Sequence, residues 1–210
     1  MLGANKDQSS LNLESGWLCL EYANTLDWHA SDNPVESIHN YEDLVQWFLK
    51  VGIISDKEKE NILKKSVIST INSSVIYTQA INLRENIYGI FSAIAGGTEP
   101  FADDLDKLNI LLPDIMNHLQ IKYTSNSYSW AWSNLEESPD QILWPLARSA
   151  ASLLTSPDRK RVGECADDRG CGWLFLDTSK NKSRRWCDMR NCGNRNKVRK
   201  YYQKKRIMKN

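Results

Sequence analysis

The sequence predicts a mainly α-helical protein of the α+β class. We expect a helical N-terminal domain with one β-hairpin, followed by a small C-terminal module of a hairpin and a helix. Three observations favour this organisation. Apolar residues recur at helical spacing through most of the N-terminal half, and one segment alternates aromatic and small polar residues as a strand does. Four of the five cysteines lie within 28 residues near the C-terminal end.

Two helices are expected in the first third of the chain. Residues 44–53 have the i, i+3, i+4 apolar spacing of an amphipathic helix, and Gly52 is placed to end it. The next helix follows Ser55, a good N-cap residue. Glu58 stands three residues later, so the two side chains can form a capping box.

Two longer helices are expected next. Residues 77–95 repeat apolar side chains at helical period up to Gly96 and Gly97. Residues 103–116 have a similar pattern. We expect Pro113 to end this second helix, because proline lacks a backbone N–H and clashes with the preceding turn.

Residues 121–135 are predicted to form the β-hairpin. Tyr128, Trp130 and Trp132 alternate with small polar residues, and residues 124–127 (TSNS) supply a turn. We expect both tryptophans to belong to the core, with ligand stacking as the alternative.

A last N-terminal helix is predicted over residues 139–156, with Pro139 near its start, Pro145 at a first turn or a kink, and Pro157 at its exit. We place a domain boundary at this point. It divides the chain into an N-terminal domain of residues 1–158 and a C-terminal module of residues 159–210.

Charge divides the chain in the same place. Residues 1–158 hold 10 Lys and Arg against 21 Asp and Glu, a net charge of −11. Residues 180–210 hold 13 against one, a net charge of +12. A basic end of this kind is typical of proteins that bind nucleic acid. The alternatives are a solvated tail and a basic end that docks on the acidic domain.

The cysteines Cys165, Cys171, Cys187 and Cys192 are spaced as C-x5-C and C-x4-C, with 15 residues between the pairs. Four thiolates suit the tetrahedral coordination of zinc, and a module of about 45 residues is too small to fold on its apolar core alone. The sequence therefore predicts a structural Zn²⁺ site. Reduced core thiols or a redox-sensing dithiol pair are the alternatives.

The elements around the cysteines predict a finger of the treble-clef or zinc-ribbon type. Residues 172–177 are expected to form one strand, residues 178–182 a turn and residues 183–186 the returning strand. The basic segment after Cys192 predicts a helix with Asn194 as its N-cap.

This module resembles a known family. The stretch CGWLFLDTSKNKSRRWCDMRNCGNRNKVRKYY (171–202) is similar to the CGNR zinc finger, named for the tetrapeptide at residues 192–195. The segments LCLEYANTLD (18–27), LRENIYGIFSAIAGG (83–97) and PLARSAASLL (145–154) resemble the ABATE domain that usually accompanies it. The resemblance implies a bacterial, stress-responsive transcription regulator whose four cysteines bind zinc and whose finger binds DNA.

For a DNA partner, phosphate contacts should supply most of the affinity, because each neutralised phosphate releases counterions. Basic residues of the hairpin suit phosphates, and arginines of the helix suit guanine edges. The predicted nucleic-acid contacts are Lys180, Lys182, Arg184, Arg185, Arg195, Lys197, Arg199, Lys200 and Lys204. RNA is the alternative partner.

The N-terminal domain is expected to receive the regulatory signal. Glu21 and Asn24 share one face of a predicted helix, and Arg84 and Arg148 lie in apolar helical stretches. These four residues could line a pocket for an anionic small-molecule effector. One alternative is internal ion pairs, such as Glu21 with Arg84. In a second alternative, the acidic domain masks the basic finger of the same chain. The masked finger could also belong to a second chain, and the protein would then be an oligomer.

The sequence predicts no enzymatic activity. His29, His39 and His118 are scattered, without a nucleophile motif or a phosphate-binding glycine-rich loop. An acid–base role for His29 with Asp27 and Asp32 is the alternative. Neither a membrane-spanning apolar run nor a signal-peptide pattern is visible. We therefore expect a cytoplasmic protein with reduced cysteines.

Overall fold

Two helices, α1 (Leu18–Ala23) and α4 (Ser73–Ala95), lie at the centre of the fold. The computed structural model of the 210-residue chain describes residues 13–68, 72–124, 126–133 and 139–207. The expectations for the N-terminal residues 1–12, for Ser125 and for residues 134–135 lie outside this part. None of the described helices has the length and hydropathy needed to span a membrane.

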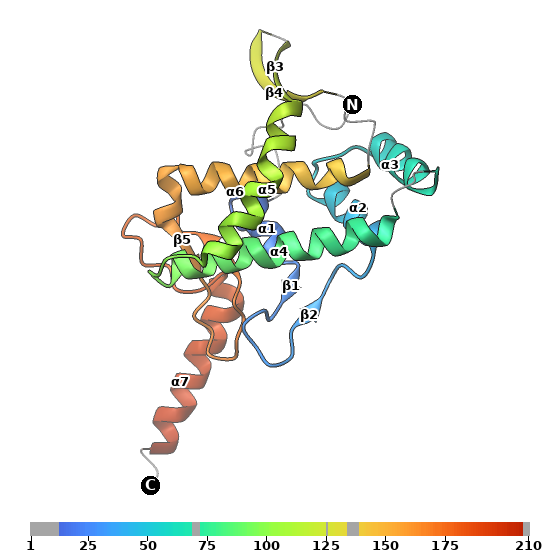
Figure 1. Cartoon of the computed structure of the whole chain (residues 1–210). Helices are drawn as coiled ribbons and strands as arrows, with labels where there is room; N and C mark the ends of the chain where they lie inside the picture. Colours follow the sequence, from blue (N-terminus) through green and yellow to red (C-terminus); the bar gives the residue numbers. More distant parts are fainter. Residues whose placement is uncertain (1–12, 69–71, 125, 134–138, 208–210) are drawn as a thin grey trace.

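The other helices of the N-terminal part pack around this centre. They are α2 (Tyr41–Lys50), α3 (Asp56–Ile68), α5 (Ala102–His118) and α6 (Trp144–Thr155). Helix α4 contacts α1, α2 and α5, and α6 contacts α1 and α5 (Figure 1). Short 3-10 turns precede and follow α6, at Pro139–Leu143 and Pro157–Arg161. The predicted mainly helical class is confirmed.

Local signals place the ends of α2 and α3 as predicted. Gly52 follows α2 with a φ of +82°, a conformation that favours glycine. The capping box at the start of α3 is confirmed: the Ser55 backbone N–H donates to Glu58 Oε2 at 2.8 Å, and the Glu58 N–H donates to Ser55 Oγ at 3.4 Å. Helix α4 begins four residues earlier than predicted, because Asn72 caps it by accepting from the Ser74 N–H.

The prediction that Pro113 ends its helix is wrong. Helix α5 continues to His118, with Pro113 in its interior on the exposed side. Leu108 and Ile115, on either side of the proline, are at most 2% exposed. The burial of these side chains against α4 and α6 offsets the hydrogen bond that the proline cannot donate.

The predicted β-hairpin is confirmed as β3 (Leu119–Thr124) paired antiparallel with β4 (Ser127–Trp132). Figure 1 shows it projecting from the end of α5. Trp132 is half-buried against Trp144, at 5.6 Å between ring centroids. Trp130 is 39% exposed and lies beneath the Arg148 guanidinium, so the expectation that it belongs to the core is wrong. The reason is that the hairpin projects from the end of α5, so Trp130 packs less closely against the helical core than Trp132 does.

Two short sheets complete the fold. Strands β1 (Leu26–Asp27) and β2 (Val35–Glu36) pair antiparallel, and β5 (Val162–Glu164) pairs with β6 (Leu174–Leu176). We expected the strand at 172–177 to pair with residues 183–186, and the structure corrects this. The Asp177 carboxylate accepts from the Ser179 and Arg184 N–H groups, which closes a loop in place of a second hairpin strand.

The predicted C-terminal helix is confirmed as α7 (Asn194–Ile207). A π-helical turn, Met189–Gly193, leads directly into it. Asn194 already has helical backbone angles, so it is not the N-cap. Asp188 caps the π-helical turn instead, by accepting from the Arg190 N–H at 2.8 Å.

Replacing Pro113 by alanine should stabilise the protein. Alanine restores the missing backbone donor in a helix whose interior continues past this point, so we expect a gain of about 1 to 3 kcal/mol in the free energy of unfolding. Urea denaturation measures this change, with Asp114→Ala as the control at a neighbouring exposed position. A loss of stability in Pro113→Ala would contradict the continuous helix.

Candidate metal centre and nucleic-acid interface

The four cysteines predicted to bind metal come together at one point. Their sulfur atoms all lie within 4.8 Å of one another, and the Sγ of Cys187 is 3.7 Å from that of Cys171 and 3.6 Å from that of Cys192. Four sulfurs bound at about 2.3 Å to a tetrahedral zinc are about 3.8 Å apart. The cluster is therefore consistent with a structural Zn²⁺ site that leaves no open coordination position.

Each ligand is positioned by a different local structure. Cys165 directly follows β5, and its N–H donates to the Trp173 carbonyl at 2.9 Å. Cys171 lies before β6, Cys187 ends the loop that follows β6, and Cys192 lies in the π-helical turn before α7. The hairpin and the turn before α7 thus bring together four ligands from a stretch of 28 residues.

The long spacing of the first pair is accommodated by a tight turn under the β1–β2 loop. The Gly170 N–H donates to the Asp167 carbonyl at 2.9 Å, and Gly170 has a φ of +86°. A Cβ at this position would lie 2.6 Å from the Ala30 carbonyl oxygen. The end of the segment between Cys165 and Cys171 therefore packs closely against the β1–β2 loop.

The electrostatics of the cluster favour a bound cation. Hydrogen bonds from the Cys171 and Cys187 thiols hold the pKa of Cys165 well below its ordinary value. The same contacts with Cys165 and Cys171 raise the pKa of Cys187. Sulfurs this close retain protons between them, and a divalent cation would replace these protons and stabilise four thiolates.

A buried aspartate organises the surroundings of the metal ligands. The Asp167 side chain is fully buried and lies 3.4, 3.6 and 3.8 Å from the guanidinium groups of Arg169, Arg195 and Arg199. Arg195 also donates to the Cys192 sulfur at 2.9 Å. Such contacts fix the orientation of a ligand and partly balance the negative charge of a four-thiolate site.

Trp28, which the sequence analysis did not single out, connects the helical part to the metal centre. It belongs to the β1–β2 loop, packs on the cysteine cluster and adopts a φ of +56°. The guanidinium groups of Arg169 and Arg195 each lie 5.0 Å from its ring centre. In the sequence, the sign of this role is a large aromatic side chain in a mostly polar loop.

The hairpin β5–β6 also shares the core of the helical part. The Asn24 amide pairs with the backbone of Leu174 through two hydrogen bonds of 2.8 and 2.9 Å. The Leu176 N–H donates to the Ser15 carbonyl, and Leu174 is fully buried in the main core. The division after residue 158 stays a prediction, but the described contacts extend across it.

The four residues predicted to line an effector pocket each contact a different partner in the structure. Arg84 forms a buried bidentate ion pair with Glu36, with both N–O distances at 2.7 Å. Glu21 instead accepts from Ser15, at 2.8 Å from its N–H and 2.6 Å from its Oγ. As described above, Arg148 lies over Trp130 and Asn24 pairs with β6. Their ligand-binding role stays a prediction.

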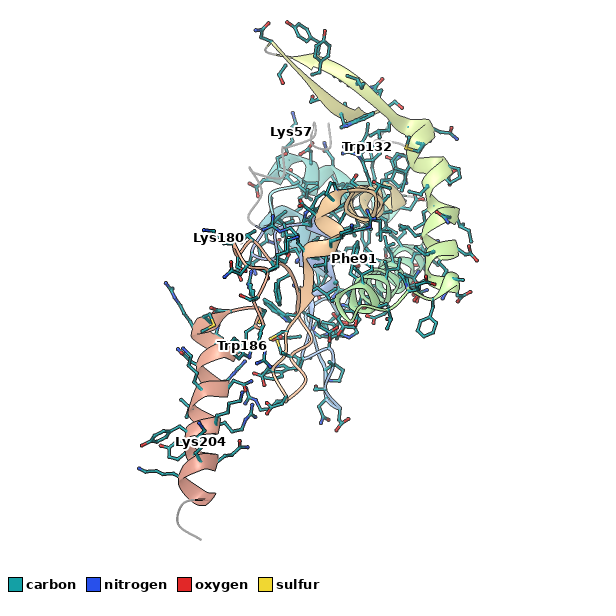
Figure 2. The ribbon with its side chains drawn as sticks, turned by 90° about the vertical axis from the view of Figure 1, so that its left-hand side faces the viewer. Lys57, Phe91, Trp132, Lys180, Trp186 and Lys204 are labelled. Atoms are coloured by element: carbon teal, nitrogen blue, oxygen red, sulfur yellow. The ribbon has the colours of Figure 1, made fainter. Side chains whose placement is uncertain are left out.

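The predicted nucleic-acid contacts fall into two groups. Arg184 donates to the Trp186 and Cys187 carbonyls and stacks on Phe175. Arg195 is held by Asp167, and Arg199 by Asp167 and Asp168. The remaining side chains are exposed on the loop or on α7: Lys180, Lys182, Arg185, Lys197, Lys200 and Lys204. Figure 2 shows Lys180 on the loop and Lys204 on the projecting part of α7.

Removing the Trp28 ring should weaken metal binding. Trp28→Ala removes the ring on which the Arg169 and Arg195 guanidinium groups lie, so these side chains support the metal ligands less well. We expect zinc affinity to fall about 10- to 100-fold. Competition with a chromophoric chelator measures the affinity. Trp130→Ala, which removes a half-exposed ring from the distant β3–β4 hairpin, is the matched control. Equal zinc affinity in the two variants would argue against the role assigned to Trp28.

Comparison with known families agrees with this geometry. The CGNR zinc finger family matches residues 161–205, which include all four clustered cysteines. The ABATE family, described as "Putative stress-induced transcription regulator" and thus not as an enzyme family, matches residues 16–157. A search of curated proteins finds no match. Because the second match covers more than half of the 210 residues, the chain belongs to the ABATE family and carries a CGNR zinc finger at its C-terminal end.

Proposed function

We propose that this protein is a DNA-binding transcription regulator. Its zinc-stabilised finger contacts DNA, and its helical part receives a signal from a ligand or a partner. The observation that carries the proposal is the placement of the exposed cations. Exposed Lys and Arg side chains lie on two segments, the loop 178–185 and α7, which both connect directly to metal-ligating cysteines. A closed metal site would hold these segments in a fixed relation, as recognition of a duplex backbone requires.

The two groups of cations suggest different roles. Exposed lysines such as Lys180, Lys197 and Lys200 are suited to phosphate oxygens, because their ammonium groups remain mobile and hydrated. Arg195 and Arg199 are oriented by Asp167 and Asp168, so their guanidinium groups are ordered before any partner binds. Pre-ordered side chains lose less entropy on binding, which favours Arg195 and Arg199 for any contact with base edges.

Contacts between the helical part and the finger suggest how a regulatory signal could reach the DNA-binding surface. Trp28 and Asn24 belong to the helical part and touch the metal cluster and β6, respectively. A ligand or partner that moves the β1–β2 loop would therefore change the support of Arg195 and the start of α7. We place this function in the cytoplasm, where a reducing environment keeps the four thiols available for zinc.

DNA affinity should depend steeply on salt. Neutralisation of six phosphates gives a slope of about −5 in log affinity against log salt, which is roughly a thousandfold loss between 50 and 200 mM. Lys200→Gln should reduce this slope by about one unit. Fluorescence anisotropy with a duplex oligonucleotide checks both values, and Lys122→Gln on the β3–β4 hairpin serves as the control.

Two outcomes would count against this function. One is an affinity for duplex DNA that stays flat over this range of salt. The other is a salt slope that Lys122→Gln lowers as much as Lys200→Gln does. A clear preference for single-stranded RNA over the duplex would move the proposal to the alternative partner.

A further inference from the structure

A groove of about 710 Å³ lies between α4, α5 and the start of α6. The apolar part of its lining, called the floor below, includes Leu111, Ile115 and Trp144, and amide side chains of α4 complete the lining. Ile110, which is 73% exposed, lies at its edge. The volume is in the range of sites that bury several side chains or a drug-sized ligand. The groove faces solvent in the single chain, so it offers apolar surface to a partner.

The rim of the groove is acidic. Three carboxylates, from Glu85, Asp114 and Asp140, and one ammonium group, that of Lys107, line the groove. Glu85 is paired with Arg84 at 3.0 Å, so Asp114 and Asp140 contribute most of the negative charge. Lys107 is itself paired with Asp103 at 2.8 Å. The groove therefore favours a cationic occupant with an apolar face.

Helix α7 has this chemistry. It carries seven Lys and Arg and no acidic residue. Val198, Tyr201 and Tyr202 lie at i, i+3 and i+4 and are 55, 57 and 64% exposed. Apolar side chains at this spacing form one stripe, which is the pattern of a helix that binds in a groove.

The groove of the same chain is out of reach of α7. The helix begins at the cysteine cluster, where Asp167 and Asp168 hold Arg195 and Arg199. From this fixed start α7 projects away from the body, and it points away from α5 in both views (Figures 1 and 2). An occupant with the chemistry of α7 therefore has to come from another molecule.

We infer that the groove binds α7 of a second copy of the chain, and that two chains exchange these helices in a reciprocal dimer. Each chain supplies one groove and one helix, so a two-fold axis satisfies both contacts and closes the assembly. Charge complementarity orients the helix, and the apolar stripe fills the floor. With respect to the proposed function, on which this step rests, the dimer covers cations of α7 and competes with DNA.

The oligomeric state tests the dimer without reference to DNA. In sedimentation equilibrium at 50 mM salt, the parent protein should have twice the mass of one chain. Ile110→Glu and Tyr202→Glu place a carboxylate on the groove and on the helix, respectively. Both positions are exposed, so folding should be retained, as circular dichroism can verify. We expect each variant to show a twofold loss of mass.

Mixing the variants separates this arrangement from other dimers. Tyr202→Glu retains an intact groove and Ile110→Glu an intact helix, so an equimolar mixture should regain part of the dimer mass through one remaining contact. Tyr128→Glu, on the exposed face of the β3–β4 hairpin, is the matched control and should remain dimeric. A monomeric parent, a dimer that survives both substitutions, or a dimer that only Tyr128→Glu disrupts would overturn the inference.

DNA binding then tests the competition. At a protein concentration at which the parent is dimeric, Ile110→Glu should bind duplex DNA several-fold more tightly, because its helices are released. Equal affinity would overturn the masking. Should neither protein bind DNA, the proposed function fails, while the measured masses still decide whether the helices are exchanged.

Discussion

Four sulfur atoms held within 4.8 Å of one another set the geometry of the C-terminal module. The segments that carry them are a three-residue strand pair, a loop and one turn of π-helix, none of which could persist alone. A single cation bound by these four sulfurs would stabilise the module through coordination bonds, in place of the many apolar contacts of a larger core. The direction of α7 follows from this point, because its first turn continues directly from Cys192.

The second constraint is the shared core of the two family segments. Leu174 lies in the main core, and the Asn24 amide pairs with its backbone as a neighbouring strand would. Trp28 packs against the metal cluster. If the strand moved relative to this buried amide, both hydrogen bonds would be lost and buried polar groups would be left without partners. The orientation of the finger is therefore coupled to the position of α1 and the β1–β2 loop.

Sequence reasoning succeeded where the determining interactions are local or chemically specific. The capping box of Ser55 and Glu58 needs only three residues, and the cysteines have few other uses at such density. It failed at Pro113, where the burial of neighbouring side chains outweighs a local rule. It also missed Trp28 and the pairing of β5 with β6, because both depend on contacts between segments far apart in the sequence.

The close approach of the first cysteine loop to Ala30 also constrains how such proteins can diverge. Cβ atoms at Gly170 and Gly172 would lie 2.6 and 2.8 Å from the Ala30 backbone. An insertion in either loop would force the other to move, and with it Trp28. We therefore expect insertions or deletions in the β1–β2 loop to be accompanied by changes in the loop between the first two cysteines, although about 140 residues of chain separate the two loops.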